Sequence, residues 1–174
     1  MSGALSKRPN RRSLAVIQMH HASLPHARTP AAGLPIWLVL AALLALPVNA
    51  PPASARTQAS ITVARLVNQV RAAHGTDRLD VHEHLNHVAL DQAQRMAQRG
   101  ALFHNPNLVS AMVGDWQWVG ENVGYGPNVK KVQAAFMNSR THRANILDPD
   151  YTRLGTATIR RGSRVWVVQV YLAK

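Results

Sequence analysis

The sequence lacks cysteine altogether and is poor in acidic and aromatic residues. The absence of thiols excludes disulfide bonds, thiolate metal sites, a cysteine nucleophile and lipid attachment through an N-terminal cysteine. The sequence has a single long apolar run, which excludes a membrane protein with several spans. What the sequence does contain suits one packed domain, because 47% of its 174 residues are hydrophobic and only 16% are charged.

The N-terminal part has the features of a secretory signal peptide. Residues 1–35 carry five basic side chains and no acidic one, and the apolar run follows at residues 36–46. That run is short for a membrane span, which needs about 20 residues, but it suits the hydrophobic region of a signal peptide. Ala53, Ser54 and Ala55 supply a small-x-small cleavage pattern, so we expect residues 1–55 to be removed by cleavage after Ala55. The alternatives are a true start at Met19 and an uncleaved membrane anchor.

The net charge of +12 comes from 20 Lys and Arg against 8 Asp and Glu. The predicted signal peptide holds five of the basic residues, and the others are spread along the chain, with small groups at residues 130–131 and 160–164. Proteins that bind nucleic acids usually gather basic residues on one face and interleave them with aromatic residues. Neither small group contains an aromatic residue. We therefore expect a solvated surface and no nucleic-acid partner.

Apolar residues at a spacing near 3.6 predict three helices. These begin at Ser60, at Asp80 or His82, and after Asn128, and the first two end at Gly75 and Gly100. Residues 101–127 are rich in glycine and proline, which predicts loops around one short strand. Residues 154–159 and 165–172 predict two strands joined by a turn at 161–163. Helices come first and strands mostly last, so the expected class is α+β, with helices packed on an antiparallel sheet.

A histidine-rich segment at residues 82–87 resembles the H-E-x-x-H pattern of metalloproteases. The second histidine of that pattern would have to stand at position 86, which is Asn86. Glu83 and His87 have the i, i+4 spacing, but they lie on the polar side of the predicted helix with Asp91 and Arg95. We therefore interpret the segment as a solvated helix face and not as a metal site.

A second set of candidates consists of His104, Glu121 and His142. Glu121 stands in an apolar and aromatic stretch, where a carboxylate is costly to bury unless it is paired or hydrogen-bonded. Two imidazoles and one carboxylate suit Zn²⁺ with water in an open fourth position. The spacing between the three is long, so periodicity does not show that they meet. The alternative is that the three groups hydrogen-bond to one another and tie loops to a helix without any ion.

Residues 61–172 resemble the CAP superfamily, also called SCP domains, which comprises cysteine-rich secretory, antigen-five and pathogenesis-related-one proteins. They are most similar to its cysteine-free bacterial secreted branch. The matching segments lie in the family's order, and they are residues 66–71, Phe103 with His104, residues 120–123 (Gly-Glu-Asn-Val), 136–149, 151–155 and 166–171. The resemblance implies a CAP-type α-β-α sandwich with a central antiparallel sheet, over residues 58–174.

The resemblance also implies a surface cleft that holds two histidines and acidic residues, and in some relatives this cleft binds a divalent metal. By motif position the residues are His104, Glu121 and His142. Members outside the bacterial branch carry a second acid near the end of the third helix, where this chain has Asn138 and Ser139. We therefore expect at most a weak site for a divalent metal such as zinc.

The family has no agreed enzymatic activity, and a fold does not supply one. We expect a secreted binding module whose cleft holds a divalent metal, a small apolar ligand such as a lipid, or the surface of a partner. Membrane association is expected only through an uncleaved signal. The alternative is a metal-dependent hydrolase acting on extracellular or envelope substrates. A hydrolase needs a base beside the metal-bound water, and Glu121 cannot be that base if it is itself a ligand.

Overall fold

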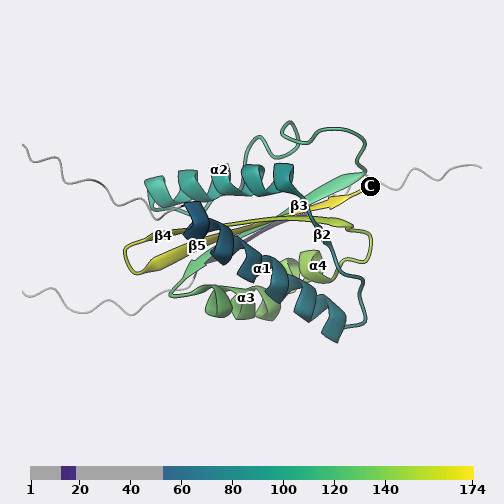
Figure 1. Ribbon diagram of the computed structural model, residues 1–174, viewed down its shortest axis with the longest axis horizontal. Helices are drawn as coiled ribbons and strands as arrows, with labels where there is room; N and C mark the ends of the chain where they lie inside the picture. Colours follow the sequence, from purple (N-terminus) through teal and green to yellow (C-terminus); the bar gives the residue numbers. More distant parts are fainter. Residues whose placement is uncertain (1–12, 19–52) are drawn as a thin grey trace, which may run out of the picture.

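The computed structural model describes residues 13–18 and 53–174, with side chains described from residue 58 onward. The elements in chain order are β1 (Ser13–Gln18), α1 (Ala53–Ala73), β2 (Asp80–Val81), α2 (Glu83–Arg99), β3 (Trp118–Gly126), α3 (Val129–Asn138), α4 (Arg140–Leu147), β4 (Arg153–Arg161) and β5 (Arg164–Ala173). Figure 1 shows them as three layers, with α2 on one face of the sheet and α1, α3 and α4 on the other. The predicted α+β class and the α-β-α sandwich are confirmed.

The sheet has the strand order β1-β3-β5-β4-β2. Its three long strands are antiparallel, because β5 pairs with β3 on one side and with β4 on the other. The two outer strands run parallel to their neighbours, β1 to β3 and β2 to β4. The prediction of an antiparallel sheet is therefore correct for the centre and wrong for the edges. The edge strands escaped prediction because β2 has only two residues and β1 lies within the predicted signal peptide.

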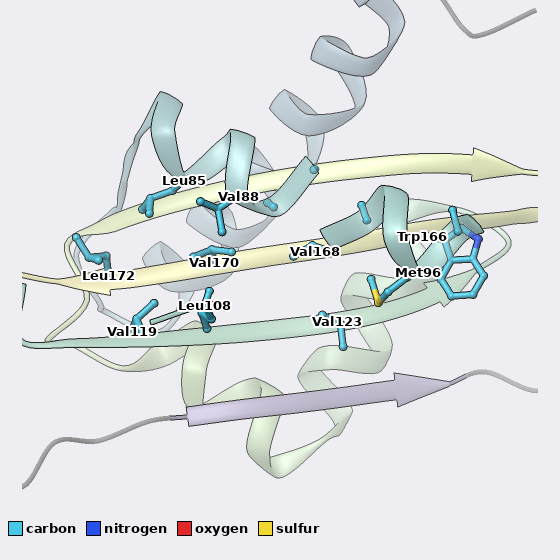
Figure 2. Packing of buried hydrophobic residues seen from close by; sticks show 14 of the residues in the cluster. Leu85, Val88, Met96, Leu108, Val119, Val123, Trp166, Val168, Val170 and Leu172 are labelled. Carbon is cyan, nitrogen blue, oxygen red and sulfur yellow. The ribbon is translucent and has the colours of Figure 1, made fainter. Parts of the chain in front are cut away.

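One hydrophobic cluster lies between α2 and the sheet (Figure 2). The helix contributes one buried stripe, which includes Leu85, Val88 and Met96, and β5 contributes Val168 and Val170. Gly155 of β4 lets the helix come close, because a Cβ at this position would overlap the backbone of Leu85. The absence of a side chain at residue 155 therefore sets the distance between α2 and the sheet.

A second cluster fills the opposite face of the sheet, beneath α1, α3 and α4. Its members are the buried apolar residues of these helices together with residues of the strands, and they include Val63, Val67, Val132, Phe136, Ile146, Leu154 and Val167. Side chains alternate along a strand, so β5 serves both clusters and its residues from Val165 to Ala173 are all buried. This explains why β5 reads as a nearly continuous hydrophobic run.

Several predicted boundaries match the structure. Gly100 ends α2 in the left-handed conformation, with φ of 68°, and the side chain of Asn128 caps α3 by accepting a hydrogen bond of 3.0 Å from the Lys131 amide. Three boundaries differ. The first helix starts at Ala53 and not at Ser60, the strand after residue 117 has nine residues and is not short, and α4 was not predicted.

The signal-peptide prediction falls mostly outside the described residues, and this includes the apolar run at 36–46. Two parts of it are described: β1, and the first turn of α1, in which the predicted cleavage position at Ala55 lies. Within the described part of the chain, none of the helices combines the length and the apolar character needed to cross a membrane. Cleavage after Ala55 remains a prediction.

Candidate functional site at the His104–Glu121 pair

The structure brings His104 and Glu121 into direct contact. Glu121 lies on β3 between Val119 and Val123, so its side chain points to the α2 face of the sheet. His104 lies in the loop after α2, and its Nδ1 is 2.6 Å from Glu121 Oε1. The glutamate side chain is 0% exposed and that of the histidine 21%. A carboxylate only accepts hydrogen bonds, so the Nδ1–H donates, and Nε2 of the neutral ring keeps its lone pair.

The two carboxylate oxygens of Glu121 have different surroundings. Oε1 also accepts a hydrogen bond of 3.0 Å from the backbone N–H of Asn105. Oε2 is buried and has no hydrogen-bond partner among the described residues. A buried carboxylate oxygen without a donor is costly, and nearly all buried polar groups in native proteins are paired with protein groups or ordered water. The site therefore has one satisfied oxygen and one that can receive a donor or a cation.

The loop that carries His104 is fixed by polar side chains of α2. Gln92, which is fully buried, donates from Nε2 to the carbonyl of Phe103. Arg95 Nη2 donates to Gln92 Oε1 and to Asn105 Oδ1, both at 2.9 Å. The sequence placed Arg95 on a solvated face, and this was wrong because the guanidinium turns inward to the loop. The available signal was Gln92, a polar residue in the middle of an apolar helical stripe.

His142 lies in a different layer. It belongs to α4, is 1% exposed, and its ring stacks on Phe136 with 5.0 Å between ring centroids. Its Nδ1 is 2.7 Å from the hydroxyl of Ser139, the residue that precedes α4. Among the described residues, no group of three or more His, Asp or Glu side chains could hold a metal ion. The three candidates therefore do not fit a three-ligand metal site, although two of them pair.

A buried network of amides connects α4 to the sheet behind Glu121. Asn122 donates to the His142 carbonyl at 3.2 Å and to Gln169 Oε1 at 3.0 Å, and Asn145 donates to Asn122 Oδ1 at 2.8 Å. The hydroxyl of Tyr171 donates to the same Gln169 oxygen at 2.6 Å, and full burial raises the pKa of this phenol well above its usual value. The network fixes the position of His142 relative to β3.

Arg71 of α1 holds the other end of α4. Its guanidinium is 0% exposed and donates to the carbonyls of Asp77, Ile146, Asp148 and Tyr151. Burial lowers the pKa of the group, and nearby Tyr171 and Asp148 partly offset that effect. A cation among the last carbonyls of a helix is stabilised by the helix dipole. Sequence reasoning did not identify this role for Arg71.

The histidine-rich segment at the start of α2 is on the surface, as predicted. His87 Nε2 lies 3.8 Å from Glu83 Oε1, and both side chains are largely exposed. His84 instead contacts the carbonyl of Ala111 at 2.7 Å. These contacts are those of a solvated helix face and its neighbouring loop.

Comparison with known proteins places this chain in a family. Residues 64–171 match the model of the CAP family, described as the cysteine-rich secretory protein family. The chain is 29% identical over 115 residues to the protein YkwD of Bacillus subtilis (strain 168), covering 62% of this chain and 44% of that protein. It therefore spans less than half the length of this relative.

Solved structures support the same assignment of fold. A cysteine-rich secretory protein of Staphylococcus aureus subsp. aureus Mu50 matches with a TM-score of 0.61 and 22% identity, over 71% of this chain and 40% of that one. An extracellular protein containing an SCP domain from Bacillus anthracis str. Ames also matches with a TM-score of 0.61 and 22% identity, over 68% and 41% of the two chains. An outer surface protein of Borrelia burgdorferi has a TM-score of 0.60 at 14% identity, over 66% and 91%. With the family model covering more than half of its residues, the chain belongs to the CAP family of cysteine-rich secretory proteins.

Proposed function

We propose that this CAP domain is a secreted binding module whose ligand is held at the His104–Glu121 pair. The observation that carries the proposal is Glu121 Oε2, a buried carboxylate oxygen without a donor among the described residues. A ligand that brings a cation or an N–H or O–H group to this oxygen removes the cost of its burial. The extracellular SCP-domain protein from Bacillus anthracis supports the proposed location.

A divalent metal such as zinc would bind the pair at a different atom, His104 Nε2, and not at Glu121 Oε2. Glu121 holds the Nδ1–H of His104, which is the arrangement of a carboxylate that orients a metal-binding histidine. In that arrangement His104 Nε2 is the ligand and Glu121 positions it. The described residues supply too few further ligands for tight binding, so we expect weak binding that decreases in acid, because only the neutral imidazole binds a metal.

Calorimetric titration of the exported protein with zinc tests this site. We expect Glu121→Gln to weaken binding by about tenfold or more, because a neutral amide orients His104 poorly and removes the negative charge. Glu83→Gln, the same change at an exposed glutamate on α2, serves as the control and should bind as the wild type does. His142→Ala reports whether His142 also contributes. Equal binding by wild type and Glu121→Gln would contradict the proposed site.

A small apolar or lipid ligand has a separate candidate place. A hollow of about 320 Å³ beside α1 is lined by Ser60, Ile61, Ala64, Arg65, Asn68, Arg78, Val81, Asn86 and Thr156. Ile61 and Val81 are more than half exposed there, and two arginines lie close to them. Apolar surface beside positive charge suits an anionic amphiphile such as a fatty acid.

Native mass spectrometry with an added fatty acid checks the lipid ligand. Ile61→Ser should reduce the bound fraction several-fold, because it removes apolar contact area within the hollow. Val113→Ser makes a similar change at another exposed apolar residue outside the hollow and should leave binding unchanged. Loss of binding in both variants, or in neither, would speak against this hollow.

Metal-dependent hydrolysis is less well supported than binding. With Oε1 of Glu121 holding His104 and the Asn105 amide, the described residues place no third His, Asp or Glu beside the pair to act as a base for a metal-bound water. Secretion itself is tested by the N-terminus of the exported protein, which we expect at Arg56 or within a few residues of it. An intact Met1 or Met19 in the membrane fraction would instead support the anchor.

A further inference from the structure

The outer edge of β3 carries a strand from the N-terminal segment. β1 pairs with β3 in parallel, in a register that runs from Ser13 opposite Gly120 to Gln18 opposite Tyr125. Figure 2 shows β1, the purple strand, lying along β3 on the side away from β5. The edge of β3 is thus filled by residues that the sequence assigns to a removable signal peptide.

This edge lies at the candidate site. In the register, Leu14 stands opposite Glu121 and Ala15 opposite Asn122. β1 also contacts α4, the helix that carries His142. The backbone of β1 therefore borders Glu121 on one side and the layer of His142 on the other.

Removal of residues 1–55 would leave β3 as an edge strand. All nine residues of β3 are buried, and alternate residues of a strand direct their N–H and C=O groups to the same side. An edge with unpaired backbone groups and buried side chains is a template for another strand. Among the described residues outside β1, one hydrogen-bond donor to the backbone of this edge is Asn145, which donates to the Glu121 carbonyl at 3.3 Å.

The sequence of β1 suits this role independently of export. Its residues, Ser-Leu-Ala-Val-Ile-Gln, are mostly aliphatic and contain neither proline nor charge, while Arg11 and Arg12 precede them. The basic region of a signal peptide requires positive charge but no β-prone stretch. The stretch is therefore unexplained by the signal peptide and explained by pairing with β3.

We propose that the edge of β3 from Gly120 to Tyr125 is a site that accepts an extended peptide in parallel register, and that residues 13–18 of this same chain occupy it until the signal peptide is removed. The proposal rests on the proposed function, because the occupied edge borders the ligand site at Glu121. While β1 is in place, it covers the backbone edge of β3 beside Glu121. Processing then opens the edge of β3 beside the ligand site.

Engineered disulfides test the pairing, and the absence of natural cysteine makes the result unambiguous. In the full chain, Val16→Cys with Val123→Cys joins two residues that are opposite each other in the register. Val16→Cys with Val119→Cys is the control, because Val119 is also buried on β3 but lies beyond the end of β1. We expect the first pair to cross-link under mild oxidation and the second not to. Failure of the first pair, or equal cross-linking of both, would overturn the proposal.

Hydrogen exchange measures the same contact without a cross-link. Ala15→Pro with Val16→Pro in the full chain should speed exchange of the β3 amides that face β1 by about tenfold or more, while the β4–β5 amides stay protected. Ala22→Pro, outside β1, should leave all of them unchanged. A synthetic peptide of residues 11–20 should restore protection in the double variant, and its proline counterpart should not. Unchanged β3 exchange in the double variant, or no rescue by the peptide, would reject the strand-accepting site.

The two proposals fail separately. Cross-linking and exchange report on β1 without any ligand, whereas the zinc titration uses the processed protein without β1. Zinc binding without cross-linking would retain the ligand site and remove the strand, and the opposite result would retain the strand and remove the metal.

Discussion

Arg71 places a charged group in the core and satisfies it entirely with main-chain carbonyls. It joins α1 to the end of α4 and to the segment before β4, since its partners include Ile146, Asp148 and Tyr151. Arg71→Met removes the donor to four carbonyls, of which those of Ile146 and Tyr151 are buried, so we expect a loss of about 3 kcal/mol in the free energy of unfolding. Arg71→Lys retains a charge and three donors and should lose less. Urea unfolding of the three proteins measures the order, and a methionine variant as stable as the wild type would contradict it.

Two tyrosines make the fold sensitive to alkali. Burial raises the pKa of Tyr171 well above its usual value of 10.0 and also raises that of Tyr151, whose ring centroid is 5.3 Å away. Both phenols keep their protons in the folded state, whereas the unfolded chain begins to lose them near pH 10. The two tyrosines should therefore leave the free energy of unfolding unchanged below about pH 10. Above that pH they should lower it, by up to about 1.4 kcal/mol per pH unit for each tyrosine.

Denaturant unfolding between pH 8 and pH 11 checks this slope, and Tyr171→Phe provides the comparison. The variant loses the hydrogen bond to Gln169, so it should be less stable at neutral pH, but its stability should decline less steeply in alkali. Identical slopes for the two proteins would show that Tyr171 does not carry the effect.

At the scale of elements, the contact between α2 and β4 has no room for a methyl group. A Cβ at Gly155 would overlap the backbone of Leu85, and a backbone cannot move aside as a flexible side chain does. Gly155→Ala should therefore cost about 3 kcal/mol, through displacement of the whole helix. Gly162→Ala is the matched control: its φ of 58° is strained for alanine but nothing lies within 4 Å, so it should cost only about 1 kcal/mol. Thermal unfolding would separate the two, and equal losses would argue against the close approach.

The helix α4 depends on polar contacts more than on apolar ones. Arg140, Thr141, Arg143 and Ala144 are exposed, while its inner face presents His142, Asn145 and Ile146. Asn145→Ala removes the donor to Asn122 Oδ1 and should cost about 1–3 kcal/mol. Hydrogen exchange should locate the loss in α4 and the neighbouring part of β3. Unchanged protection of α4 in this variant would mean that Ile146 and Arg71 hold the helix without the amide network.

The same composition explains why α4 was not predicted from the sequence. The inner face of α4 consists of one histidine, one asparagine and one isoleucine, so apolar residues do not recur there at a helical spacing. The face can be buried because Asn145 has hydrogen-bond partners on the sheet. β3 was underestimated for a related reason. Glycines usually indicate loops, but in this strand Gly120 and Gly124 stand between β5 and β1, and Gly126 pairs with Val165 of β5. In both cases the deciding contacts come from residues distant in the sequence.

Where apolar residues recur at one regular spacing, the sequence alone was enough to predict the helix or strand. α2, α3, β4 and β5 were predicted from spacing and caps, and the family resemblance grouped His104, Glu121 and His142 in one cleft without needing any period. What could not be predicted was the side of the sheet on which each candidate lies. Because side chains alternate along β3, Glu121 faces α2 while Asn122 faces α4, and this one-residue difference separates His142 from the pair.

At the scale of the whole molecule, the order of strands in the sheet differs from their order in the chain. β5 is the last strand of the described chain and also the middle one, with β3 and β4 pairing on either side of it. No pair among the three long strands can form before β5 is present, because β3 and β4 do not pair with each other. A chain leaving the ribosome therefore has helices available but lacks its sheet until residues 164–173 have been synthesised. The strand order therefore makes the central sheet form late, after all of the described helices and the other two long strands have been synthesised.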